Sequence, residues 1–144
     1  MWSEVPGWDI PYDPETGIVD RTPVVVYRVE DRLEFGPYHE GSPVYDDVIS
    51  IALARHLPPL HLDLPFEVDR EQFPYWQTCG FRSREQAEWW FDGLLPYLEA
   101  NGYRLVEYEV PAGAITDTVS GLQVAFDLDC AALLTDWPEE EEAA

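Results

Sequence analysis

Three stretches of the chain have the hydrophobic pattern of β-strands. Residues 23–29 form a β-branched run that predicts a strand buried on both faces up to Tyr27. Residues 103–110 alternate, with valine, tyrosine and valine at every second position. Residues 122–128 alternate as well and predict a half-buried strand, because side chains two apart lie on one face.

Two other stretches have helical signatures. Ser42-Pro43 predicts a helix start, with serine at the N-cap and proline at the first helical position, and Pro58-Pro59 predicts its end. Ser83 and Gln86 form a capping box that opens the second helical stretch. Gly93 is expected to break this stretch, Pro96 to restart it, and residues 130–134 to add a short helical turn.

These elements predict a single α+β domain with a small, twisted, mainly antiparallel sheet and two helical stretches. We place the domain at residues 23–136, after an irregular arm at 1–22 that packs on the core and before an acidic disordered tail at 137–144. The proline-rich residues 57–78 are expected to form a long loop, which its aromatic side chains keep packed.

The charge changes this picture more than any other property of the composition. The 144 residues include 29 acids and only 8 arginines and lysines together, for a net charge of −21. Without the four glutamates Glu139–Glu142, the rest of the chain still carries a net charge of −17. Direct binding of DNA is excluded because that affinity comes largely from phosphate neutralisation. Solubility, a high-salt habitat or a basic partner each explain such a surface.

Other sequence features limit the cellular location of the protein and the catalytic or metal-binding chemistry that it could carry. The chain shows neither a membrane span nor a secretory leader, and Cys79 and Cys130 lack CxxC spacing, so we expect a reduced, cytoplasmic protein. Phosphate-binding and nucleophile-elbow motifs are missing. Cys79, before a helix start, is the best nucleophile candidate, with a buried structural cysteine as the alternative. His61 and Asp63 match no metal-ligand spacing, so we expect no metal site.

A set of short motifs carries a family resemblance over residues 24–127. The motifs are YRVE at 27–30, GPY at 36–38, CGF-x-S-x-EQ at 79–86, WF at 90–91 and QV-x-F at 123–126. This pattern resembles a family of small proteins of bacteriophages and actinobacteria. The resemblance implies a phage-type accessory protein and no particular activity.

The same positions resemble, more weakly, the ADP-ribosyltransferase-like fold. That resemblance implies an NAD site in which Arg28 holds the ribose, Phe81 and Ser83 border the nicotinamide, and Gln123 occupies the position of the catalytic glutamate. Gln123 is neutral, whereas an oxocarbenium-like transition state requires a negative charge, which Asp127 or Glu109 could supply instead.

Each of these residues also has a structural explanation. Arg28 can pair with an acid, Phe81 can belong to the core, Ser83 can act only as a helix cap, and Gln123 can be an exposed strand residue.

Two functions therefore remain open. The first is binding of a basic host protein, including a DNA-binding one, through carboxylates that imitate phosphates, with no cofactor. The alternative is an NAD-dependent ADP-ribosyltransferase-like enzyme that modifies a host target.

Overall fold

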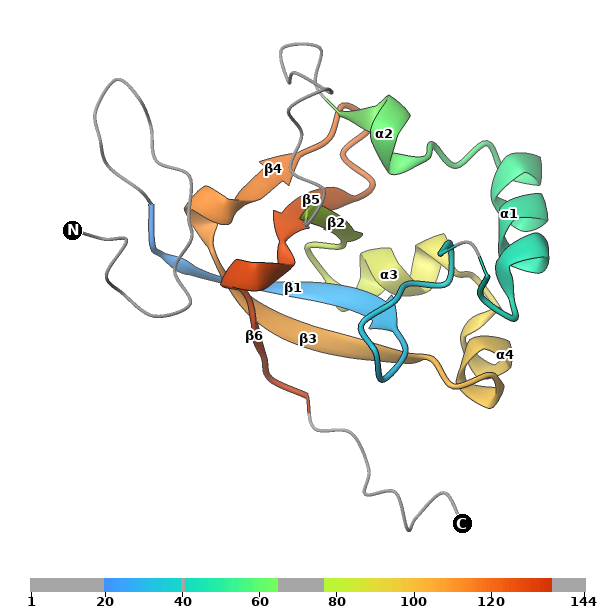
Figure 1. Ribbon diagram of the computed structural model, residues 1–144. Helices are drawn as coiled ribbons and strands as arrows, with labels where there is room; N and C mark the ends of the chain where they lie inside the picture. The colour runs from blue at the N-terminus through green and yellow to red at the C-terminus, as the bar shows by residue number, and fades with distance from the viewer. Residues whose placement is uncertain (1–19, 40, 65–76, 136–144) are drawn as a thin grey trace, which may run out of the picture.

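The computed structural model describes residues 20–39, 41–64 and 77–135 (Figure 1). The predictions for the arm at 1–22 and the tail at 137–144 therefore lie almost entirely outside the described residues. In the described part of the chain, no helix is long and apolar enough to cross a membrane.

Two small antiparallel sheets form the β part of the fold. The first has the order β1-β3-β6 and consists of β1 (Pro23–Glu30), β3 (Arg104–Pro111) and β6 (Ala132–Leu133). The second has the order β2-β5-β4 and consists of β2 (Gln77–Gly80), β5 (Val124–Asp127) and β4 (Ile115–Asp117). A bridge between Tyr27 and Phe81 joins β1 to the chain just after β2. The predicted α+β class is confirmed, with two sheets in place of one.

The helices gather at one end of the sheets (Figure 1). They are α1 (Tyr45–Ala54), the single turn α2 (Leu60–Asp63), α3 (Arg84–Trp90) and α4 (Leu95–Ala100). The Ser83 half of the capping box at α3 is confirmed, since Ser83 Oγ accepts from the Gln86 backbone N–H at 3.1 Å. The Gln86 side chain in turn accepts from the backbone N–H of Arg82.

Several predicted boundaries are wrong. Helix α1 has Val44 at its N-cap, because the Ser42 hydroxyl accepts from the Val44 N–H in a turn that precedes the helix. Residues 132–133 form strand β6 against Tyr108 and Glu109 rather than a helical turn. Helix α2 and the first two residues of strand β2 lie inside residues 57–78, which were expected to form a loop. The aromatic side chains expected to pack that loop lie at 66–76, outside the described residues.

Burial along β1 also differs from the prediction. Val25 is 37% exposed, whereas burial extends beyond Tyr27 through Arg28, Val29 and Glu30. Strand β1 is thus fully buried at its carboxyl end, where it carries two charged side chains. Buried charges require partners, so this end of the strand must lie against groups that satisfy Arg28 and Glu30.

Two hydrophobic clusters hold the elements together. One lies between the sheets and includes Val26, Val106, Val110 and Phe126. The other joins the helices to β1 and consists mainly of Val29, Val44, Val48, Leu57, Phe81, Ala87, Trp90, Phe91, Leu98 and Tyr103. The predicted alternation in β3 is confirmed, and Val106, Tyr108 and Val110 form its buried face.

Candidate functional site

Arg28 is the centre of a buried polar network at the carboxyl end of β1. Its side chain is 5% exposed. Its Nε donates to Glu30 Oε1 at 3.0 Å, Nη1 to the Cys79 carbonyl at 2.8 Å and Nη2 to the Glu34 carbonyl at 3.2 Å. All three guanidinium nitrogens therefore serve contacts within the fold. We call Arg28, Glu30 and Tyr108 the Arg28 network.

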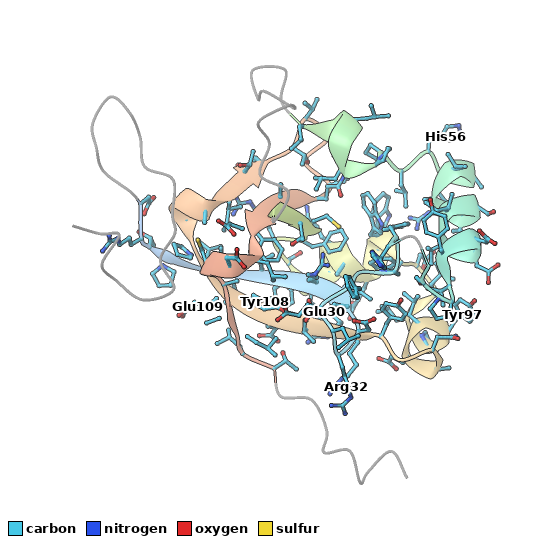
Figure 2. The ribbon with its side chains drawn as sticks, in the orientation of Figure 1. Glu30, Arg32, His56, Tyr97, Tyr108 and Glu109 are labelled. Atoms are coloured by element: carbon cyan, nitrogen blue, oxygen red, sulfur yellow. The ribbon has the colours of Figure 1, made fainter. Side chains whose placement is uncertain are left out.

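Glu30 is the acidic member of this network and is 1% exposed. Its Oε2 accepts from the Tyr108 hydroxyl at 2.6 Å, so both carboxylate oxygens have donors (Figure 2). Burial raises the pKa of Glu30, although the Tyr108 hydroxyl and the Arg28 charge act in the opposite direction. Burial and the Glu30 contact raise the pKa of Tyr108, which keeps the phenol a neutral donor.

The turn after β1 is shaped to receive the guanidinium. Asp31 Oδ1 accepts from the backbone N–H groups of Leu33 and Phe35, and Glu34 has a φ of 72°. A Cβ on Gly36 would lie 3.2 Å from Arg28 Nη2, so glycine lets the turn approach the arginine closely. Arg28 lines a cavity of about 450 Å³ beside this turn, together with Thr78 and Cys79.

Gln123 lies just before β5 and is 2% exposed, so its expected place as an exposed strand residue is wrong. Its Nε2 donates to the Pro58 carbonyl at 2.9 Å and to Asp63 Oδ2 at 3.0 Å. The Asp63 carboxylate also accepts from the backbone N–H and hydroxyl of Ser120. These bonds attach α2 to the β4–β5 hairpin.

Gln123 lines a second cavity, which has a volume of about 440 Å³ and a mainly apolar wall. We call it the α1–α2 cavity. Tyr38 lines it as well, and the Tyr38 hydroxyl accepts from the Trp90 indole N–H at 2.9 Å. Burial raises the pKa of Tyr38 to about 12. Cys79 lines both cavities and is a free thiol.

The four residues expected at an NAD site do not converge on one cavity. Arg28 lines one cavity and Gln123 the other. Phe81 is 2% exposed and packs against Trp90 and Phe91 at ring-centroid distances of 5.5 and 5.9 Å. Ser83 caps α3. Arg28 therefore pairs with an acid, Phe81 belongs to the core and Ser83 acts as a helix cap, as the structural explanation of each residue predicted.

The two acids expected to replace a catalytic glutamate differ in burial. Asp127 is 1% exposed and accepts from the Asp129 N–H and the Cys130 thiol, whereas Glu109 is exposed on β3. Cys79 belongs to β2, five residues before α3, and not to a helix N-terminus. In the described part of the chain, no group of three or more histidine, cysteine or acidic residues could hold a metal ion.

The partners Glu30, Tyr108 and Asp63 were not identified from the sequence. One signal was present, because Arg28 and Glu30 are two residues apart on a strand and so share a face. The other contacts depend on tertiary packing. Tyr108 lies 78 residues from Glu30 along the chain, and Asp63 lies 60 residues from Gln123.

A third feature is an acidic outer face along and just after α3. Glu85, Glu88 and Trp89 have helical spacing that places them within about 100° of one another, and Asp92 follows in the turn after α3. All four are exposed, and Trp89 is exposed by 50%. Among the described residues, none of the three carboxylates forms an ion pair. We call these four residues the α3 acidic face.

Comparison with known proteins identifies a phage family. The model of the family described as "Bacteriophage T4 Y00F protein" matches residues 23–140. Neither curated proteins nor solved structures give a match, so the similarity to the ADP-ribosyltransferase-like fold gains no support. Because the matched range covers most of the chain and spans both sheets and all four helices, the chain belongs to the bacteriophage T4 Y00F protein family.

Proposed function

We propose that this phage accessory protein acts by binding a basic protein of the host through the α3 acidic face. The main support is the unpaired charge of that face. Glu88 and Asp92 lie near the carboxyl end of α3, where the helix dipole disfavours negative charge, and the last turn has no basic residue. The Arg55 guanidinium, which donates to the Trp89 and Trp90 carbonyls, lies at this end of the helix, and a basic partner would add further positive charge there.

The surrounding surface has the same sign. The described residues include eleven exposed acids and four exposed arginines. The acids are Asp20, Glu34, Asp46, Asp47, Glu85, Glu88, Asp92, Glu99, Glu109, Asp117 and Asp129. Two of the arginines, Arg82 and Arg84, already pair with Asp117 and Glu107. A surface of this sign accelerates association with a basic partner, most strongly at low salt.

Trp89 supplies the apolar part of the proposed contact. An exposed tryptophan among charged residues is the residue type that most often contributes strongly to protein–protein binding. The Arg55 guanidinium lies 4.8 Å from the Trp89 ring centroid and donates to the Trp89 and Trp90 carbonyls. Arg55 thus fixes the end of α3 and holds the tryptophan in place.

NAD chemistry receives less support from the geometry. Arg28 would have to leave Glu30, Cys79 and Glu34 to bind a ribose, and its cavity is not the one that Gln123 lines. We therefore take partner binding as the proposed function.

Affinity purification from host-cell lysate with two charge-matched variants tests the proposal. The first variant combines Glu85→Gln, Glu88→Gln and Asp92→Asn. The control removes the same charge elsewhere through Asp46→Asn, Glu99→Gln and Glu109→Gln, all at exposed positions.

We expect the parent chain and the control to retain a basic protein at about 50 mM salt and to release it at about 500 mM, because salt screens exposed charges. The α3 variant should retain little of it at either concentration. Failure of the parent chain to retain any basic protein at low salt would refute partner binding. Equal losses in both variants would refute the α3 face as its location.

A further inference from the structure

The α1–α2 cavity has the dimensions and the lining of a small-molecule site. Its volume of about 440 Å³ lies within the usual range of such sites, roughly 300–1,000 Å³. Ile49, Ala52, Leu57 and Trp90 contribute apolar wall. Leu53 lines the cavity and is 69% exposed, so the cavity reaches the surface.

Gln123 gives this apolar cavity a fixed hydrogen-bond acceptor. Its Nε2 faces two acceptors, the Pro58 carbonyl and the Asp63 carboxylate, and this determines the orientation of the amide. The Oε1 atom must then point the other way. Within the described residues the side-chain hydrogen bonds of Gln123 are made by Nε2 and none by Oε1. Oε1 is not among the buried atoms that lack a partner, so it remains accessible from the cavity that Gln123 lines. An acceptor held in this way lacks only a donor from a ligand.

Charge limits what the ligand can be. Among the described residues no arginine lines the α1–α2 cavity, and the chain carries a net charge of −21. An anionic ligand would therefore enter against the field of the protein without a counter-charge inside. The aromatic rings of Trp90 and Tyr38 favour a flat apolar body.

We propose that the α1–α2 cavity binds a neutral fused aromatic molecule whose ring N–H donates to Gln123 Oε1. An engineered cavity of about 150 Å³ already holds benzene, so this one has room for two or three fused rings. The site is separate from the α3 acidic face and does not depend on the proposed partner.

Indole and 1-methylindole are the matched probes, because indole has a ring N–H donor and 1-methylindole carries a methyl group in its place. We expect indole to bind saturably in calorimetry and 1-methylindole to bind about tenfold more weakly, since 1-methylindole would cover Oε1 without supplying a donor. Binding of indole should shift the side-chain amide resonances of Gln123 in the nitrogen–proton NMR spectrum of the parent chain, which requires no substitution.

A pair of variants on α1 tests the location. Ala52→Phe fills the cavity, whereas Ala54→Phe adds the same side chain at an exposed position of the same helix. We expect Ala52→Phe to abolish indole binding and Ala54→Phe to preserve it. Absence of indole binding, equal affinity for both probes or an unmoved Gln123 amide would each overturn the proposal. Full binding by a folded Ala52→Phe variant would do the same.

Discussion

Substitution of Tyr108 by phenylalanine tests the Arg28 network. The change removes one hydroxyl and leaves Glu30 Oε2 without the donor that lies 2.6 Å away in the parent chain. A hydrogen bond to a charged group contributes about 1.5–3 kcal/mol to stability. We therefore expect the free energy of unfolding at pH 8 to fall by about 2–3 kcal/mol, and the Tm by about 6–12 °C for a chain of this size.

The loss should depend on pH. Burial raises the pKa of Glu30 above its value in the unfolded chain, so between those two pKa values the folded protein binds more protons. Stability then falls as pH rises through that interval. Loss of the Tyr108 hydroxyl removes a contact that lowers this pKa, so the pKa rises further, the interval widens and the total fall in stability becomes larger. The destabilisation should be smaller at pH 5 than at pH 8.

Tyr103→Phe is the matched control. Tyr103 is also 2% exposed, but its hydroxyl donates to Ser42 Oγ, which carries no charge. We expect this variant to lose about 1 kcal/mol, equally at both pH values. Urea unfolding at pH 5 and pH 8 measures both variants. A Tyr108→Phe loss that equals the control and does not change with pH would refute an ionised Glu30 in the network.

Substitutions at three other positions test close contacts and hydrogen bonds elsewhere in the fold. Gly80→Ala should cost about 2–3 kcal/mol in urea unfolding, because its Cβ would lie 2.5 Å from Val26 Cγ1 and 3.0 Å from the Tyr27 carbonyl; a neutral result would contradict the close approach of β2 to β1. Ser83→Ala should lower the Tm by about 3–5 °C through loss of the α3 cap, and Ser83→Gly should restore most of it. Asp63→Asn should cost about 2 kcal/mol and speed hydrogen exchange at Ser120, because an amide cannot accept from every donor that faces the carboxylate.

Local patterns predicted the elements that depend on local physics. Strands β1 and β3 followed from their apolar runs, and the start of α3 followed from its capping box, because each is decided within a few residues. Strand β2 was missed because its four residues, Gln77–Gly80, contain one β-branched residue and form a strand only against β5. The two-residue strand β6 likewise exists only through its pairing with β3.

The candidate site depended still more on tertiary contacts. Alternation around residues 122–128 suggested that Gln123 faces solvent, but α2 covers it and supplies Asp63 as a partner. The sequence likewise allowed Arg28 to pair with any of 29 acids, and only the fold selects Glu30 and two carbonyls. Sequence pattern therefore located the residues of interest, whereas their roles required the geometry.

The pairing of β1 with β3 governs when the chain can fold during its synthesis. Tyr27 pairs with Glu107, so the first strand waits for a partner that is made 80 residues later. At about 5–20 residues per second, the ribosome needs about 4–16 s to supply it. Meanwhile the apolar run at 24–26 is an unpaired strand of the kind that aggregates. Arg28 and Glu30 follow that run directly, and in the nascent chain their charges oppose association with other copies. The pair that later becomes a buried ion pair of the fold thus protects the chain before it has folded.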